Sequence, residues 1–246
     1  RHEVGLIQER LDNEENAHRK FFSFANTVTT INYQKTFLGH GWVGIMFQAQ
    51  PGQEYSEIVL HVKFKENDAT LQQETLGNLG VNLVYGAFHL YDNPRRLIKS
   101  LYDDISVDKI EIDMIDFQGP AFPYVDNRLM SLQLIKNSMT EAVIFNSEGK
   151  NMLPADLLYR KDVFAVRGSF RPVTHVTVDM LECATSMFVQ EPKVQGEDVL
   201  VIMEMTLKNL LDNGKIDYKD FLDRVDILAS LGKIVLISNF AEYNFK

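Results

Sequence analysis

The sequence has very little cysteine and no long apolar run, and both shortages narrow what the protein can be. Its single cysteine, Cys183, rules out an internal disulfide and suits a reducing compartment. No apolar segment approaches the roughly 20 residues of a membrane-spanning helix. No secretory signal is expected, since the first residues lead into a charged helical pattern. We therefore expect a cytoplasmic protein without a membrane partner.

Basic residues are also scarce. Lysine and arginine number 25 against 34 aspartates and glutamates, which gives a formal net charge of -9. A protein that binds duplex nucleic acid usually needs a basic face, so this balance argues against nucleic acid as a partner. It leaves room for one local basic pocket that holds a phosphate-bearing small molecule. The 246 residues, of which 45% are hydrophobic, are enough to bury a core in one large or two small domains.

Several familiar catalytic patterns are missing as well. No set of cysteine, histidine and aspartate has metal-ligand spacing, so no metal-binding residues are predicted. A Gly-x-Ser-x-Gly elbow and a Walker glycine loop are both absent, which leaves hydrolase and P-loop functions without support. Internal repeats and low-complexity segments are absent too.

The pattern of residues 1–150 predicts an N-terminal α/β domain in which helices and strands largely alternate. Apolar spacing predicts a helix over residues 3–24. Three helix starts carry good capping signals, at Asp68, Asn93-Pro94 and Asp126. The predicted strands cover 57–64, 81–90, 109–117 and 142–145. The turn from Asn146 to Lys150 is the best candidate for a domain boundary.

Some polar residues of this first domain invite two interpretations. His40 and Trp42 lie in a glycine-rich stretch that is either a binding loop or a hairpin corner with Trp42 in the core. Glu111 and Asp113 share one face of a strand, where they could bind Mg²⁺ or simply face solvent. His61, on another strand, is interpreted as structural.

Residues 151–246 read as a Rossmann-like parallel βαβαβ unit. Strands are predicted at 161–167, 199–205 and 234–237, and helices at 178–189 and after an N-cap at Asp217. This order is half of a doubly wound fold. A further βα unit would normally follow the last strand, so the unit could be incomplete.

The turn after the 161–167 strand is the most basic place in this acidic chain, with Arg160, Lys161, Arg167 and Arg171 close together. Backbone N–H groups and the positive end of a helix meet at such a strand–turn–helix junction. We therefore expect the turn to receive a phosphate group.

The same turn resembles the first βα turn of the nucleotidylyltransferase superfamily, which reads approximately G-[TS]-F-[DN]-P-x-[TH]-x-G-H. The matching stretch is Gly168-Ser169-Phe170-Arg171-Pro172-Val173-Thr174-His175-Val176-Thr177-Val178-Asp179. The superfamily includes nicotinate-mononucleotide and phosphopantetheine adenylyltransferases. The whole chain also looks like a bacterial family often labelled nicotinate-nucleotide adenylyltransferase.

The resemblance implies nucleotidyl transfer from ATP with Mg²⁺. By position, it implies catalytic roles for Thr174 and His175 and nucleotide binding by the residues of the turn, namely Arg167, Gly168, Ser169, Phe170, Arg171 and Thr177. The sequence departs from the motif at Val176, where the family has glycine, and at Thr177, where it has a second histidine. Arg171 replaces the usual acid or amide.

Two further functions remain open. The chain could be a non-catalytic ligand-binding or scaffold protein that needs no cofactor. In that case Arg171 and His175 would be held in intramolecular pairs, and Val176 would fill the nucleotide's space. Alternatively, chemistry could lie at Glu204, Ser238 or Asn239, near the ends of the predicted parallel strands.

Overall fold

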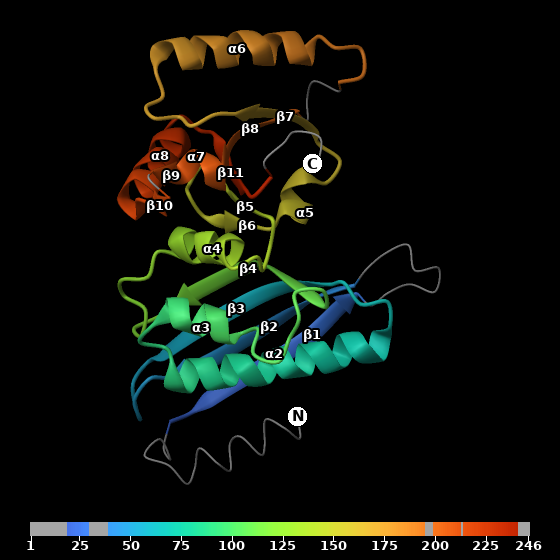
Figure 1. The fold of residues 1–246 in the computed structure, drawn as a ribbon, viewed down its shortest axis with the longest axis vertical. Coiled ribbons are helices and arrows are strands. Elements are labelled where there is room, and N and C mark those ends of the chain that lie inside the picture. Colours follow the sequence, from blue (N-terminus) through green and yellow to red (C-terminus); the bar gives the residue numbers. More distant parts are fainter. Residues whose placement is uncertain (1–18, 30–38, 195–198, 213, 241–246) are drawn as a thin grey trace. The chain divides into compact units, whose positions relative to one another are not determined.

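The computed structural model describes residues 19–29, 39–194, 199–212 and 214–240, and the chain divides into two units, Arg1–Thr140 and Glu141–Lys246. Within the described residues the protein is mixed α/β, with seven helices and eleven strands (Figure 1). No helix in these ranges is long and apolar enough to cross a membrane. The predicted boundary near residue 150 falls inside the second unit, because the 142–145 strand pairs with the 234–238 strand.

The first unit is built on an antiparallel sheet of four strands in the order β1-β2-β3-β4. The strands are β1 (Phe21–Thr29), β2 (His40–Gln48), β3 (Tyr55–Phe64) and β4 (Ile110–Gln118). Most of the predicted helix over residues 3–24 lies outside the described residues. Its last residues, Phe21 to Phe24, belong to β1 instead.

Three helices cover one face of this sheet and enclose the core (Figure 1). They are α2 (Ala69–His89), α3 (Pro94–Ser100) and α4 (Asn127–Lys136), and Asp68, Asn93 and Asp126 cap them as predicted. Alternate strand residues such as Val43, Ile58 and Ile112 point into the core. The intervening residues form the opposite face of the sheet.

The predicted strand over 81–90 is wrong, because α2 continues through it to His89. Gly77 and Gly80 do not end the helix. Leu76, Leu79, Leu83 and Ala87 are all buried, and their spacing places them on one helical face. Burial of this stripe outweighs the weak helix propensity of the glycines and valines.

The second unit is built on a mixed sheet of five strands in the order β6-β5-β11-β8-β7. Three of them, β7 (Asp162–Arg167), β8 (Val199–Thr206) and β11 (Ile234–Ser238), are parallel to one another. The other two, β5 (Ala142–Phe145) and β6 (Asn151–Met152), are added antiparallel. Five smaller or connecting elements complete the unit: α5 (Pro154–Leu158), α6 (His175–Val189), α7 (Leu207–Leu210), α8 (Tyr218–Ser230) and the hairpin of β9 (Leu211–Asp212) with β10 (Lys215–Ile216).

Helices α6 and α8 lie on the same face of this sheet. Phe188 of α6 stacks on Phe164 of β7, and Phe221 of α8 packs edge-on against Phe145 of β5. The strand register places Phe164 and Phe145 on one face. Both helices connect successive parallel strands, and right-handed crossovers in the same direction place their helices together in this way.

Candidate functional site

A cavity of about 560 Å³ lies beside the turn that joins β7 to α6. Its walls are mostly apolar and come from β7, the turn, α6 and Met203 of β8. The turn residues Arg167 to Pro172 line it, together with Phe164, Ala165, Val166, Thr177, Met180, Leu181, Ala184 and Met203. The predicted turn therefore borders a cavity large enough for a small molecule.

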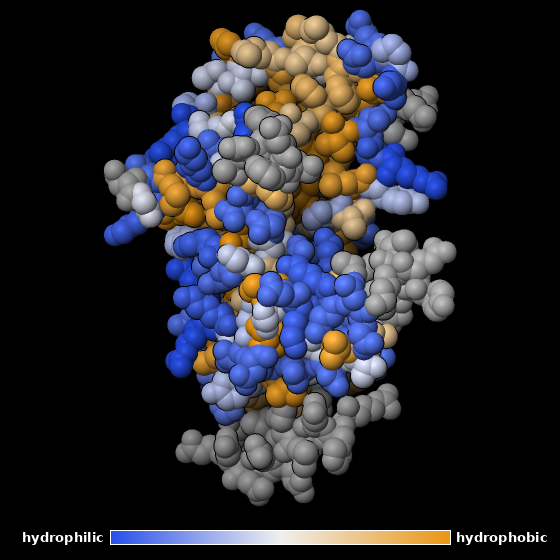
Figure 2. Space-filling view, turned by 45° about the vertical axis from the view of Figure 1, so that its right-hand side comes forward, coloured by the Kyte–Doolittle hydropathy of each residue, from blue (hydrophilic) through white to orange (hydrophobic). Residues whose placement is uncertain are grey.

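Helix α6 covers this cavity loosely. Leu181 is its one buried residue among those described, whereas Val176, Met180 and Met187 are each about two-thirds exposed. In Figure 2 apolar residues form much of the surface in the upper part of the molecule, where α6 lies. Val176 is not among the residues that line the cavity, and its side chain is exposed.

The turn folds back on itself at Phe170. This buried residue has a φ of 46°, and its ring lies where a side chain at position 168 would stand. A Cβ on Gly168 would come within 2.9 Å of the ring, so a larger residue there would have to displace Phe170. Gly168 thus makes room for Phe170.

Arg167 belongs to the cavity wall, but its side chain is directed elsewhere. Its guanidinium donates to Glu204 Oε1 at 2.9 Å, and the hydroxyl of Ser238 donates to the same oxygen at 2.6 Å. Glu204 is fully buried, and it follows Met203, so the two side chains lie on opposite faces of β8. The structure therefore unites Arg167, Glu204 and Ser238 away from the α6 side.

Arg171 is half-exposed and ion-paired within the chain. Its Nε lies 3.1 Å from Asp220 Oδ1 and its Nη1 lies 3.5 Å from Asp212 Oδ2. Asp220 also pairs with Arg224, whose buried guanidinium donates to the carbonyls of Ser169 and Asn209 at 3.1 and 3.0 Å. Arg224 thereby fixes the turn. Its importance could not be read from the sequence, since it lies on a helix 55 residues from Ser169.

Thr174 and Thr177 form the N-terminal cap of α6. The Thr177 amide donates to Thr174 Oγ1 at 3.2 Å, and the Thr174 amide donates to Thr177 Oγ1 at 3.4 Å. This reciprocal capping box explains why α6 begins at His175, three residues earlier than predicted. Thr177 lines the cavity. His175 is exposed and, like Thr174, is not among the lining residues.

A polar cluster lies on the face of the first sheet opposite α2, α3 and α4. His61 Nδ1 lies 2.6 Å from Asp113 Oδ1, and His61 Nε2 lies 2.9 Å from His40 Nδ1. Lys63 Nζ pairs with Asp113 Oδ2 at 2.8 Å, and the ring of Trp42 packs edge-on against His61. His40 and Trp42 therefore belong to a strand, and Trp42 faces away from the main core.

Asp113 is buried yet charged. Burial by itself raises the pKa of its carboxyl, but the hydrogen bond from His61 and the charge of Lys63 outweigh it, so the pKa lies below its usual value. Burial likewise opposes the charge of Lys63, but Asp113 and Glu111 raise its pKa. Glu111 accepts a hydrogen bond from Thr140 at 2.6 Å. Within the described ranges no group of three or more histidine, cysteine or acidic side chains is arranged to hold a metal ion.

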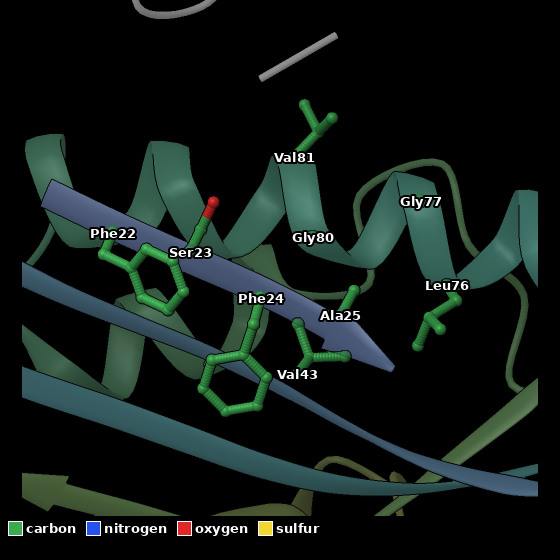
Figure 3. Close-up of a pocket in the computed structure, with 10 residues that line it drawn as sticks. Phe22, Ser23, Phe24, Ala25, Val43, Leu76, Gly77, Gly80 and Val81 are labelled. Atoms are coloured by element: carbon green, nitrogen blue, oxygen red, sulfur yellow. The ribbon is translucent and has the colours of Figure 1, made fainter. Parts of the chain in front are cut away.

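A second cavity, of about 380 Å³, lies between β1 and α2 in the first unit (Figure 3). Ser23 and Ala25 line it from the strand, and Leu76, Gly77 and Gly80 line it from the helix. All of its lining residues are uncharged, and Ser23 has the one polar side chain among them. It therefore offers fewer groups that could orient a ligand than the cavity beside α6.

Comparison with known proteins gives no relative: no family model, curated protein or solved structure matches the chain.

Proposed function

We propose that the second unit binds a small molecule of the nucleotide class, with its ring in the cavity beneath α6 and its phosphate at the 167–177 turn. The observation that carries this proposal is the position of the cavity. It adjoins the turn that follows β7, a parallel strand, and such turns are where ligands bind in α/β proteins. We interpret β7-α6-β8-α8-β11 as a Rossmann-like half.

The residues that line the cavity include some that suit the ring of such a ligand and some that suit its phosphate. Phe164, Met180 and Met203 offer apolar and polarisable surface that suits a planar ring. Ser169 and Arg171 supply a hydroxyl and a cation from the turn. A pocket that is mostly apolar with a few polar groups is typical of small-molecule sites.

Arg171 is suited to exchange partners. Its side chain is 48% exposed, and its ion pairs with Asp212 and Asp220 are exposed in part. Such pairs contribute only about 0–1 kcal/mol to stability. A phosphate could therefore displace one carboxylate from Arg171 at small cost.

The proposal is confined to binding. Thr174 is engaged in the capping box, and His175 lies outside the cavity lining, so neither supports a catalytic role. Any Mg²⁺ would reach the site with the phosphates of the ligand. Nucleotidyl transfer, implied by the resemblance of the turn, requires in addition that His175 contact the bound phosphates.

Calorimetric titration with ATP and Mg²⁺, AMP, adenosine and pyrophosphate tests the proposal. Filling the cavity with Ala184→Leu should abolish binding of every ring-bearing compound. The control Ser186→Leu places the same side chain at an exposed position of α6 and should leave binding intact. Arg171→Ala should weaken AMP about tenfold, the effect of losing one charge-assisted hydrogen bond, without changing the affinity for adenosine.

Two results would contradict this function. One is the absence of heat for all four compounds at millimolar concentration. The other is binding that survives Ala184→Leu in a variant whose melting temperature is unchanged, because the ligand would then lie elsewhere.

A further inference from the structure

The two edges of the second sheet differ in how well they are protected against pairing with another strand. One edge is β6, which has only two residues, Asn151–Met152. The other edge is β7, which has six residues, and its central residues Val163, Phe164, Ala165 and Val166 are all apolar. Proteins commonly shield an edge strand by shortness, a proline, a bulge or a central charge. Strand β7 has none of these four features, so it is the edge to which a further strand can be added.

The outer side of β7 presents the backbone groups of its odd-numbered residues. The amide of Gly168 donates to the carbonyl of Glu204 at 3.0 Å, so the even-numbered residues direct their backbone groups towards β8. Val163 and Ala165 direct theirs away from β8, and both residues are exposed. In the described ranges no strand pairs with this side of β7. The N–H and C=O of Ala165 therefore point outward from the middle of the strand.

This geometry is complementary to itself. In an antiparallel pair, two directly opposite residues can exchange both N–H···O=C bonds, and their side chains lie on the same face of the sheet. A two-fold axis perpendicular to the sheet at Ala165 satisfies both conditions, because it pairs this residue with Ala165 of a second copy. The two methyl groups are small enough to lie side by side at the axis. Such pairing joins the two five-stranded sheets into one.

One flank of α6 lies over the same edge. Helix α8 lies further along this face of the sheet, towards β5. The flank of α6 that carries Val178 and Thr185 is half-buried, whereas the flank that carries Val176, Met180 and Met187 is about two-thirds exposed. The exposed flank is therefore the one that faces away from α8, beyond β7.

The two-fold axis at Ala165 brings the exposed flanks of two α6 helices together, because it keeps both helices on the same face of the joined sheet. Helix α6 covers both β7 and β8, since Phe164 and Met203 line the cavity beneath it. Two such helices are separated by about two strand spacings, roughly 10 Å, the distance at which helices pack. Methionine and apolar side chains on the exposed flank are typical of protein interfaces.

We propose that the chain forms a symmetric dimer with a second copy of itself, in which β7 pairs antiparallel about Ala165 and the exposed flanks of α6 pack across the axis. A strand of six residues and a helix of 15 bury on the order of 1,000 Å² in total, at the low end for a specific interface. The dimer should therefore form at micromolar concentration. It does not depend on the ligand proposed above.

Sedimentation velocity of the full chain from about 1 µM to about 100 µM tests the dimer. Ala165→Lys places two like charges opposite each other at the axis and should weaken association about tenfold, and Ala165→Glu should do the same. An equimolar mixture of these two variants should restore the dimer, because the opposed side chains then attract each other. The controls Ala155→Lys and Ala155→Glu change an exposed alanine of α5 in the same unit, and each should dimerise as the wild type does.

Cys183 provides a second measurement, since this exposed residue lies between Met180 and Met187 along α6. Its reaction with a maleimide should slow as the wild-type concentration rises and should stay constant in Ala165→Lys. Three results would overturn the proposal: a wild type that stays monomeric throughout the range, an Ala165→Lys variant that associates like the wild type, or a mixture of the two charged variants that associates no better than either alone.

Discussion

Arg224 shows how much structure one side chain can organise. It is 3% exposed and contacts the turn, α7 and Asp220 together. Because a buried arginine replaced by an apolar residue leaves its partners unsatisfied, Arg224→Met should lower the free energy of unfolding by about 3 kcal/mol. Urea unfolding measures the loss.

Lys219→Ala is the matched control, since it removes an exposed cation paired with Asp223 on the same helix. It should change stability by less than about 0.5 kcal/mol. An equal effect of the two substitutions would show that Arg224 does not fix the turn.

Asp113 gives the first unit a specific sensitivity to acid. Its pKa in the folded protein is lowered, so its stabilising effect is complete above the unfolded value of about 3.9 and is lost as pH falls through the folded value. Asp113→Asn should therefore destabilise the protein at pH 7, by about 2 kcal/mol. The difference from the wild type should shrink as the pH is lowered towards 3. Urea unfolding followed by circular dichroism at both pH values checks this, with the exposed Asp103→Asn as control.

At the scale of elements, two glycines of α2 should respond oppositely to the same substitution. A Cβ on Gly80 meets no described atom within 4 Å, whereas one on Gly86 comes within 2.9 Å of buried Leu97. Gly80→Ala should stabilise the protein by up to about 1 kcal/mol through helix propensity. Gly86→Ala should destabilise it by about 1 kcal/mol, because the strain of overpacking exceeds that gain. Thermal unfolding distinguishes the two, and equal shifts would contradict the close approach of α2 and α3.

Elements with local signals could be predicted from the sequence. The caps at Asp68, Asp126 and Asp217 are confirmed, because an aspartate side chain bonds to amides two or three residues away. The strands at 142–145 and 234–237 are confirmed in place as well. The strand predicted at 81–90 is wrong. Burial of one stripe of apolar side chains makes this segment helical, and that burial depends on contacts with the rest of the unit.

The contacts of the candidate site could be predicted only in part. The turn lies beside a cavity, as a strand–turn–helix pattern implies. The partners of Arg171 come from a hairpin and a helix far along the chain, and no local pattern encodes them. The same holds for His40, His61 and Asp113, which three different strands bring together.

At the scale of the whole molecule, each unit contains one residue of a type that occurs nowhere else in the chain and whose signal can be followed alone. Trp42, the single tryptophan, belongs to the first unit, and the exposed Cys183, the single cysteine, lies on α6 of the second. Fluorescence of Trp42 and labelling of Cys183 can thus follow the two units separately in one sample. Acid titrations pass through the isoelectric point, about 5.2, so they require dilute protein to limit association.

The order of strands predicts a sharp effect of truncation. Strand β11 lies between β5 and β8, so a chain that ends at Gly232 lacks the centre of the second sheet. We expect such a chain to lose the protected amides of β5 and β8 in hydrogen exchange, while those of β2 and β3 persist. A chain that ends at residue 240 keeps β11 and should retain the sheet. Equal protection in both truncated chains would contradict the strand order.

That order also bears on how the protein is made. A ribosome releases β5 and β6 first, and β7 and β8 after them, yet β11, the strand that joins these pairs, emerges last of the five. The two halves of the sheet must therefore wait, with apolar borders such as Val143 and Met205 uncovered, until translation delivers residues 234–238. Completion of the second sheet therefore follows the synthesis of residues 234–238, and nascent chains stalled before that point should be prone to aggregation.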